Sequence, residues 1–430
     1  MRIALVNPPW HFENSIYFGC TAPHLPLELG CAKALLESAG HDVLMLDGHL
    51  TQTSAAALAD DIAAFAPAMT VVTTAPSYLF WRCAPPELRV PREMIDAIAG
   101  RGGRIVAIGP HGSATPGPAL RKLGADIVIR GESEEAILAL AQSWPARDVP
   151  GAAYYDHDAL RLVGPNQATR FTDLPALHWP AEWVTRHTHH HHRFDATPHG
   201  PGAEVEASRG CPYHCSFCAK IDFRDKYRRR DLAPLLQEID ALAAQGVRYL
   251  YFIDEIFLPQ PALLEALVTR GLQFGIQTRI DLWKLPLLEL LGRAGCVSIE
   301  AGVESLTESG RDALDKNCRM STDDLTDRLI IARRHVPFVQ ANLIAGPDDD
   351  RDAIAAWRDR LQRENIWSND PVPLFPYPSS PDYHARWGAP DDQAWERAHA
   401  HYLAQFDRFS DIQDSAPHPL PELEAACMAR

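Results

Sequence analysis

The chain has 430 residues, of which 46% are hydrophobic and 23% are charged, a balance typical of a globular protein with about two or three domains. Its formal net charge of −15 argues against a large nucleic-acid interface, because such a surface is basic. No run reaches the roughly 18 apolar residues of a membrane span, and the apolar run at the start is too short for a signal peptide, so we expect a cytoplasmic protein with reduced thiols and no membrane or nucleic-acid partner.

Residues 1–145 alternate short apolar runs with amphipathic segments. The runs predict strands at 2–9, 41–47, 68–75, 103–110 and 125–131. The segments between them predict helices at 26–40, 54–66, 91–102, 117–124 and 133–144. This α/β alternation predicts a doubly wound parallel sheet in a first domain. Ligands of such sheets bind beyond the carboxyl ends of the strands.

Residues 146–202 are rich in Pro, Asp and His and have weak periodicity, which is typical of a linker. They contain a histidine run formed by His187, His189, His190, His191 and His192. The run could bind a metal or a substrate phosphate, or it could be a solvated polar loop.

The βα alternation returns at residue 203. Strands are predicted at 203–208, 248–254, 274–281, 296–302, 339–346 and 371–377, with helices between them such as 233–246 and 285–295. These units are too few for a complete eight-stranded barrel and predict a partial (β/α)6 barrel over 203–377. The tail 378–430 is expected to be a small, partly helical extension that closes or extends the site.

The segment 207–220, ASRGCPYHCSFCAK, places Cys211, Cys215 and Cys218 just after the strand predicted at 203–208. Barrels of this type hold their reactive groups at that end. Structural zinc takes four ligands, and a 4Fe–4S cluster is normally held by four thiolates. Three thiolates would leave one iron open, although zinc or three unrelated core cysteines remain alternatives. The other cysteines do not cluster and are assigned no role.

The C-x3-C-x2-C spacing after the first strand of a partial barrel resembles the radical S-adenosylmethionine (SAM) superfamily. Phe217 fits the same pattern, in which an aromatic residue lies near the adenine of SAM. The resemblance implies a 4Fe–4S cluster on the three cysteines, with SAM on its open iron. It also implies an external flavodoxin- or ferredoxin-like electron donor, whose electron cleaves SAM to a 5′-deoxyadenosyl radical.

The resemblance further implies contacts to SAM along the barrel. Asp254 and Glu255 end the second strand, where an acidic group would accept the ammonium of SAM. Arg279 ends the third strand and suits the SAM carboxylate or Glu255. The remaining implied contacts follow the fourth and fifth strands: Glu300, Glu304 and Ser305 near the ribose, and Ile344 and Gly346 near the adenine.

The first strand is not followed by the G-x-G-x-x-G turn of a dinucleotide fold, which disfavours NAD or flavin. The N-terminal domain resembles cobalamin-binding domains instead. The resemblance implies cobalamin contacts in three loops: Ser77, Tyr78, Leu79 and Trp81; Gly109, Pro110, His111, Gly112, Ser113 and Thr115; and Gly131 and Glu132.

Two departures from the cobalamin-binding pattern matter. The cobalt-ligating Asp-x-His-x-x-Gly is absent, since His11 has the wrong context, and Gly109-Pro110 replaces a Gly-Gly pair. These departures suggest base-off cobalamin without a histidine ligand. Tyr78 and Trp81 either cover the lower face of cobalt or simply pack in their loop. His111 is either a cobalamin contact or a solvated loop residue.

Together these resemblances imply a cobalamin-dependent radical SAM enzyme that methylates an unactivated carbon of a small molecule, such as a natural product or a carbohydrate. A non-methylating rearrangement or cyclisation is the first alternative, and a sensor without turnover is the second. The segment 374–388 is expected to face the barrel mouth, where its Tyr, Trp and Arg residues would bind a polar substrate or close the barrel.

Overall fold

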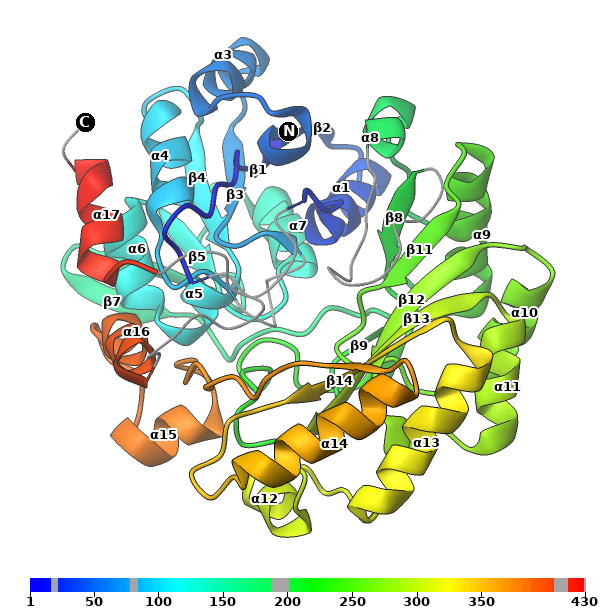
Figure 1. Cartoon of the computed structure of the whole chain (residues 1–430). Helices are drawn as coiled ribbons and strands as arrows, with labels where there is room; N and C mark the ends of the chain where they lie inside the picture. The colour runs from blue at the N-terminus through cyan, green and yellow to red at the C-terminus, as the bar shows by residue number, and fades with distance from the viewer. Residues whose placement is uncertain (17–21, 78–83, 187–200, 406–416, 429–430) are drawn as a thin grey trace.

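The computed structural model describes residues 1–16, 22–77, 84–186, 201–405 and 417–428. An N-terminal α/β part and a barrel lie side by side, and the C-terminal helices return to the N-terminal part (Figure 1). Tyr78, Leu79, Trp81 and the histidine run 187–192 lie outside the described residues, so the hypotheses about them stay predictions.

The N-terminal sheet has seven strands in the order β2-β1-β3-β4-β5-β6-β7. Its first five strands are parallel, as predicted. They are β1 (Arg2–Asn7), β2 (Asp42–Asp47), β3 (Met69–Thr73), β4 (Arg104–Ile108) and β5 (Ile127–Ile129). Since β1 lies between β2 and β3, the strand order reverses there, and such a reversal opens a crevice at the carboxyl edge.

Helices cover both faces of this sheet. They are α1 (Leu27–Ser38), α3 (Ala55–Phe65), α4 (Arg89–Ala97), α6 (Pro116–Leu123) and α7 (Glu134–Ser143), with the short α2 (Gly48–Thr51) and α5 (Pro110–Ala114). The predicted helices are therefore all present. Ser54 caps α3, because its Oγ accepts a hydrogen bond from the backbone N–H of Ala57 at 3.3 Å.

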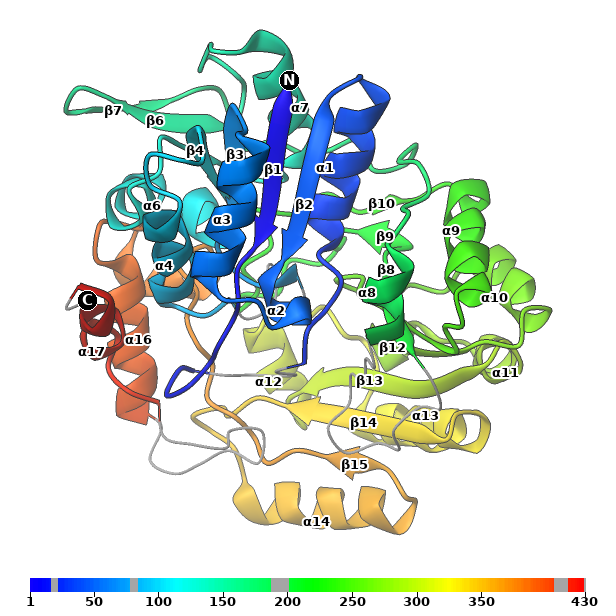
Figure 2. The same ribbon diagram turned by 90° about the horizontal axis from the view of Figure 1, so that it is seen from above.

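The predicted linker contains more regular structure than its sequence indicates. Strands β6 (Ala152–Asp156) and β7 (Ala159–Leu162) form an antiparallel hairpin that extends the N-terminal sheet at β5. Every residue of β7 is exposed, and a four-residue strand without a buried face gives only a weak sequence signal. The short α8 (Ala181–Arg186) follows. Figure 2 shows the hairpin projecting from the edge of the sheet.

The barrel is an open, all-parallel sheet of six strands in the order β15-β14-β13-β12-β11-β8. These are β8 (Gly202–Val205), β11 (Tyr249–Phe252), β12 (Gln273–Thr278), β13 (Cys296–Glu304), β14 (Phe338–Leu343) and β15 (Trp367–Ser368). The partial barrel is confirmed. A separate short pair, β9 (Ser208–Arg209) with β10 (Arg228–Arg229), flanks the cysteine segment.

The position predicted for the sixth strand is wrong. The strand that pairs with β14 is Trp367–Ser368, and the segment 371–377 continues beyond it with a single bridge between Ile344 and Val372. The physical reason is proline, which lacks the N–H that a ladder needs. Residues 371, 373 and 376 are all proline.

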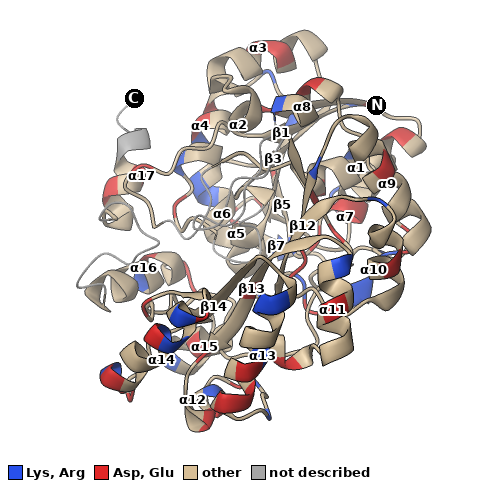
Figure 3. Ribbon diagram, turned by 45° about the vertical axis from the view of Figure 1, so that its right-hand side comes forward, with Lys and Arg blue, Asp and Glu red and all other residues tan. Residues whose placement is uncertain are grey.

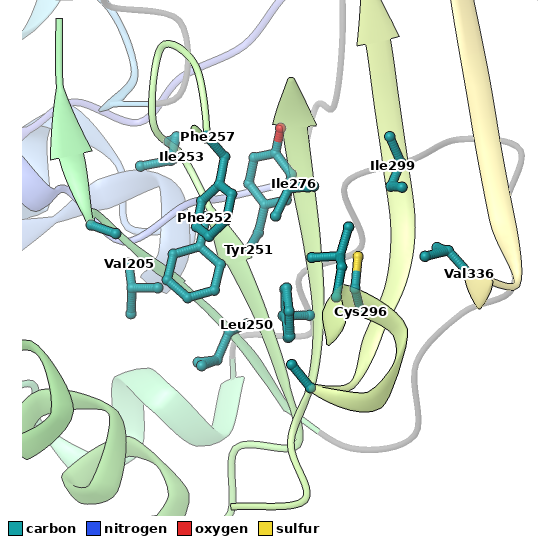
Figure 4. Close-up of a cluster of buried hydrophobic side chains, with 14 of the residues drawn as sticks. Val205, Leu250, Tyr251, Phe252, Ile253, Phe257, Ile276, Cys296, Ile299 and Val336 are labelled. Carbon is teal, nitrogen blue, oxygen red and sulfur yellow. The ribbon is translucent and has the colours of Figure 1, made fainter. Parts of the chain in front are cut away.

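The outer layer of the barrel is helical, and Figure 2 shows α14 outside β14 and β15. The helices are α9 (Leu232–Ala244), α10 (Pro261–Val268), α11 (Leu285–Arg293), α12 (Glu308–Ala313), α13 (Thr322–His335) and α14 (Arg351–Arg363), with the 3₁₀ turn η2 (Ile280–Leu282). Figure 4 shows the buried side chains between these layers, among them Val205, Leu250, Phe252 and Ile299, which are all fully buried. This core fixes the strand ends on which the site is built.

The C-terminal extension is helical, as expected. It comprises α15 (Pro381–Trp387), α16 (Ala394–Gln405) and α17 (Leu420–Met428), and Figure 1 shows α16 and α17 beside the N-terminal helices. Lys122 of α6 pairs with Glu396 at 2.6 Å and with Glu424 at 2.8 Å. These ion pairs connect the C-terminal extension to helix α6 of the N-terminal part.

The outer helices carry charges of both signs, and Figure 3 shows acidic and basic residues close together on α13 and α14. Arg360, for example, pairs with Asp323 at 3.2 Å across these two helices. None of the helices in the described ranges combines the length and the apolar character that a membrane span requires.

Candidate active site at the mouth of the barrel

A cavity of about 350 Å³ lies at the carboxyl ends of the barrel strands. Its walls come from the cysteine segment, from the ends of β11, β12 and β13, and from the segment 372–377. The lining residues are Cys211, Tyr213, Cys215, Phe217, Cys218, Ala219, Glu255, Ile256, Gln277, Thr278, Arg279, Glu300, Gly302, Glu304, Lys316, Val372, Pro373, Leu374, Phe375 and Tyr377.

The cysteine segment leaves the β9–β10 pair through Gly210. This residue has φ of +77°, and a Cβ there would lie 2.1 Å from the carbonyl oxygen of Lys226, so only glycine fits the turn. Further along, the backbone N–H of Cys218 donates to the carbonyl of Cys215 at 3.1 Å, which folds the segment back on itself.

The three thiols are free and partly exposed. Burial raises the pKa of Cys211 to about 11 and that of Cys218 to about 12, so both are protonated at neutral pH until a cation displaces the proton. Among the described residues no three His, Cys, Asp or Glu side chains are gathered tightly enough for a single metal ion. Three soft donors around one larger volume instead suit an iron–sulfur cluster.

Five other residues predicted to contact SAM share this cavity: Phe217, Glu255, Arg279, Glu300 and Glu304. Asn342 donates to Glu300 at 2.8 Å. Glu304 has φ of +65°, a left-handed backbone that non-glycine residues seldom adopt, and its carboxylate pairs with Lys316. Backbone strain of this kind tends to cluster at functional sites.

Glu255 is held on both sides. Its Oε2 accepts from the backbone N–H of Gly210 at 2.8 Å, and its Oε1 accepts from Arg224 at 3.1 Å. Burial raises the pKa of Glu255, and the Arg224 guanidinium opposes that rise. Glu255 therefore links the end of β11 to the residue just before Cys211.

Arg279 does not pair with Glu255, so that part of its predicted role is wrong. Its Nη2 donates to Asp281 at 2.8 Å, and its Nη1 donates to the carbonyl of Lys316 at 2.5 Å. The guanidinium lies 4.0 Å from the centre of the Tyr213 ring. Arg279 thus fastens the cysteine segment to the 316–317 loop at the cavity wall.

Four predicted SAM contacts do not line the cavity. Asp254 accepts from the backbone N–H of Ala207 at 2.9 Å and from the Ser208 hydroxyl, which ties β11 to β8. Ser305 contacts Thr307. Ile344 bridges to Val372, and the N–H of Gly346 donates to Asp349 at 2.7 Å. These residues support the walls.

Sequence reasoning missed several lining residues. Lys316 is buried and belongs to a loop after α12, away from every strand end, so no pattern pointed to it. Tyr213 lies between two of the cysteines, where an aromatic residue could have been noticed. Gln277 and Thr278 sit at the end of β12. The segment 374–388 was expected to face the mouth of the barrel, and Leu374, Phe375 and Tyr377 at its start do line the cavity. The rest of the segment, which includes α15, does not line it.

The described residues that are predicted to bind cobalamin lie at the carboxyl edge of the N-terminal sheet. Ser77 follows β3, Gly109 and Pro110 follow β4, and Gly131 follows β5. The Ser113 hydroxyl accepts from the N–H of Gly131 at 2.9 Å and joins two of these loops. Gly112 packs closely on β5, since a Cβ there would lie 3.1 Å from Val128.

His111 is not a solvated loop residue, so that alternative is wrong. Its ring is 1% exposed, contacts the Thr74 hydroxyl at 3.2 Å and the carbonyl of Pro85 at 2.9 Å, and stacks on Trp395. Burial lowers its pKa to about 3, so the ring is neutral at pH 7. Thr115 accepts from the Trp395 indole N–H at 3.0 Å. The buried contacts of His111 and Thr115 therefore stabilise the conformation of the loop 109–115.

Gly131 and Glu132 lie where the two halves meet. A Cβ on Gly131, which has φ of +80°, would lie 2.3 Å from the carbonyl oxygen of Gln167. The Glu132 carboxylate is buried and pairs with Arg228 and, at 3.4 Å, with Arg209 of the second half.

Comparison with known sequences supports this picture. The sequence profile of the Radical SAM superfamily matches residues 205–361. The anaerobic magnesium-protoporphyrin IX monomethyl ester cyclase of Cereibacter sphaeroides is 26% identical over 376 residues, covering 81% of this chain and 58% of the cyclase. The hopanoid C-3 methylase of Methylococcus capsulatus is 27% identical over 372 residues, covering 81% of this chain and 67% of the methylase. The chain thus spans little more than half of that cyclase.

Two solved structures share the fold at low sequence identity. The radical SAM methyltransferase TsrM of Kitasatospora setae, with cobalamin and a [4Fe–4S] cluster bound, has a TM-score of 0.70 at 19% identity over 89% of this chain and 76% of that one. The cobalamin-dependent radical SAM enzyme OxsB, with aqua-cobalamin bound, has a TM-score of 0.67 at 17% identity over 92% and 56%. The barrel of this chain therefore matches the Radical SAM superfamily over residues 205–361, and most of the chain shares the two-part fold of these two cobalamin-bound structures.

Proposed function

We propose that this chain uses cobalamin and a 4Fe–4S cluster to methylate an unactivated carbon of a small molecule. The observation that carries the proposal is the cavity of about 350 Å³ that joins Cys211, Cys215 and Cys218 to charged strand ends. For the second cofactor site we propose the carboxyl edge of the N-terminal sheet, and the fold shared with the cobalamin-bound TsrM and OxsB supports this placement. The methylases among the sequence relatives support methyl transfer.

The residues of the cavity fit a 4Fe–4S cluster with SAM. Three thiolates hold a cluster and leave one iron open. SAM ends in a zwitterion, and the cavity offers both signs of charge, with Glu255 and Glu304 for the ammonium and Arg279 and Lys316 for the carboxylate. Such charge-assisted hydrogen bonds are the strong kind. Glu300 suits the ribose hydroxyls, and Phe217 suits the adenine ring.

When bound, the cluster and SAM supply a 5′-deoxyadenosyl radical after an electron arrives from a flavodoxin- or ferredoxin-like donor, and methylcobalamin supplies the methyl group. The chain holds and orients these groups and limits the access of water. Its apolar wall, Val372 to Phe375 with Tyr377, lines the same cavity as the cysteine segment and would provide the contact surface for a substrate. We propose a small natural product or carbohydrate as the substrate, and a reducing compartment such as the cytoplasm suits the free thiols.

A ring-forming reaction without methyl transfer is the second candidate. The observation that favours it is the 26% identity to the cyclase of Cereibacter sphaeroides over 81% of this chain. Both reactions begin with the same radical, so the residues around the cluster serve either.

Product analysis separates the candidates. The reconstituted protein is incubated anaerobically with SAM, hydroxocobalamin and a strong reductant, and the nucleoside products are quantified. Methylation predicts S-adenosylhomocysteine together with 5′-deoxyadenosine, whereas cyclisation or rearrangement predicts 5′-deoxyadenosine alone. If the protein carries a full cluster and yields neither product, the proposal fails and a sensor without turnover is the better account. The variant Cys215→Ala is the matched control and should yield neither product.

A further inference from the structure

A buried network of ion pairs crosses the boundary between the two halves of the molecule. It joins five carboxylates to three guanidinium groups: Glu28, Glu132, Glu134, Glu206 and Glu255, with Arg209, Arg224 and Arg228. Arg209 and Arg224 are 0% and 1% exposed, so these charges are shielded from solvent. Interactions between buried charges are screened far less than those at the surface.

Arg224 holds the central position in this network. Its Nη2 contacts Glu28 of α1 at 3.1 Å, and its Nη1 contacts Glu206 at 2.9 Å and Glu255 at 3.1 Å. One guanidinium therefore touches a carboxylate of the first half and two carboxylates of the barrel. Its planar fork fixes their relative positions, which a lysine could not do.

Each end of this chain of contacts reaches a proposed cofactor site. On one side, Glu28 accepts from the hydroxyl of Ser77, whose Oγ also accepts from the backbone N–H of Leu27 at 3.1 Å. On the other side, Glu255 lines the cavity and accepts from Gly210, the residue before Cys211. The contacts run without a gap from Ser77 to the cysteine segment.

A second route ends at the same arginine. Glu132, after β5, contacts Arg209 at 3.4 Å, and Arg209 contacts Glu206 at 2.7 Å. Glu206 then meets Arg224 at 2.9 Å. Two of the three loops proposed for cobalamin are thus connected to Glu255 through Arg224.

We propose that Arg224 is a positioning residue that couples the two cofactor sites, so that cobalamin on the N-terminal sheet strengthens SAM binding in the barrel, and SAM strengthens cobalamin binding equally. A ligand that orders one end of a shared network lowers the ordering cost for the second ligand. Coupling between two sites is reciprocal by thermodynamic necessity and commonly amounts to about 5- to 150-fold in affinity. This inference rests on the proposed function, because it assigns the two ends of the network to cobalamin and SAM.

The test measures SAM affinity of the cluster-loaded protein by anaerobic equilibrium dialysis, without reductant, in the absence and presence of saturating hydroxocobalamin. We expect hydroxocobalamin to lower the Kd for SAM by at least about five-fold in the wild type. In Arg224→Gln, hydroxocobalamin should change the Kd for SAM by less than about two-fold. The reciprocal measurement, in which SAM changes the Kd for hydroxocobalamin, should give the same fold-change for each protein. A purely structural role would lower both affinities without making them independent of each other.

Arg230→Gln is the matched control. Arg230 belongs to the same segment, is 6% exposed and pairs with Glu238 at 2.7 Å, so its loss breaks an equally buried ion pair outside the two routes. Its variant should keep the coupling factor of the wild type. If Arg224→Gln does not fold, Glu28→Ala and Ser77→Ala interrupt the first route by removing the side-chain contacts, and each should reduce the ratio of the two SAM affinities.

The outcomes separate the two proposals. If the wild type binds both ligands but neither affects the other, or if Arg224→Gln and Glu28→Ala both retain the full coupling of the wild type, the coupling role is wrong and the proposed function stands. If the cluster-loaded wild type binds no SAM or no hydroxocobalamin, the proposed function itself fails.

Discussion

The cavity is lined by Cys211, Cys215 and Cys218. In contrast, Cys296 and Cys318 are buried in the core. Cys215→Ala should therefore lower iron from about four atoms per chain to less than one, because a cluster with three protein thiolates loses a required ligand. The far-ultraviolet circular dichroism should not change, since the thiol is partly exposed. Iron analysis after anaerobic reconstitution measures this.

Cys318→Ala is the control and should retain its iron. Iron content in Cys215→Ala equal to that of the wild type would show that the cluster, if present, is held elsewhere.

The buried carboxyl group of Glu28 should make the free energy of unfolding depend on pH. Burial is the largest cause that raises its pKa from 4.5 to about 7, with the Arg224 guanidinium opposing it. The folded state therefore binds the proton of Glu28 more tightly than the unfolded state does. The resulting contribution to the free energy of unfolding is complete below pH 4.5 and is lost as the pH rises through 7. Glu28→Gln should remove this dependence, which is on the order of 3 kcal/mol between pH 5 and pH 8.

The measurement is chemical denaturation of wild type and variant at both pH values. The stability of the wild type relative to Glu28→Gln should fall as pH rises, while exposed Glu37→Gln should follow the wild type throughout. Parallel curves for wild type and Glu28→Gln would show that Glu28 is ionised in the folded protein across this range.

At the residue scale, the sequence predicted the location of two side chains that follow strand ends. Glu255 and Arg279 follow β11 and β12 and reach the cavity as expected. Asp254 does not line it, because successive side chains at a strand end point to opposite sides. Lys316 could not be predicted from the sequence, because it lies in a loop after α12 and follows no strand end.

At the scale of elements, the β9–β10 pair positions the cysteine segment through Gly210. Gly210→Ala should cost about 1–2 kcal/mol for the left-handed backbone alone, and its Cβ, 2.1 Å from the carbonyl oxygen of Lys226, must also displace the pair. We expect reconstituted iron to fall at least several-fold. Iron analysis and thermal denaturation measure the two effects separately.

Gly246→Ala is the control for backbone strain, because Gly246 has φ of +100° and no atom within 4 Å of its Cβ position. It should lose stability but keep its iron. Equal iron loss in both variants would mean that the effect comes from reduced stability and not from the geometry of the cysteine segment.

Regular elements were predictable because their apolar residues repeat with a clear period. All five parallel strands of the first sheet and the open barrel followed from that pattern. The hairpin β6–β7 did not, since β7 is exposed on every residue. The sixth barrel strand was misplaced because the apolar segment 371–377 suggested a strand, while its prolines prevent a ladder.

At the scale of the whole molecule, the C-terminal extension packs on the loop 109–115 at the carboxyl edge of the N-terminal sheet. Trp395 is 5% exposed, stacks on His111 with ring centres 4.4 Å apart and donates to Thr115. Trp395→Ala should weaken hydroxocobalamin binding about ten-fold or more, because the loop 109–115 loses its support and large core truncations cost about 3–5 kcal/mol. Equilibrium dialysis with hydroxocobalamin measures the change.

Trp387→Ala truncates an aromatic residue of the same extension that contacts Tyr383 instead, and it should bind hydroxocobalamin like the wild type. Iron content should be normal in both variants. If Trp395→Ala binds hydroxocobalamin as tightly as the wild type does, the extension has no part in that site.

The iron and cobalt content of the anaerobically reconstituted protein, together with its electron paramagnetic resonance spectrum, shows whether both cofactors bind. We expect about four irons and about one cobalt per chain, with a base-off cob(II)alamin signal that lacks nitrogen splitting. Four irons without cobalt would contradict cobalamin binding and leave a radical SAM enzyme with an N-terminal domain of another purpose. A nitrogen-split signal would contradict the absence of a histidine ligand.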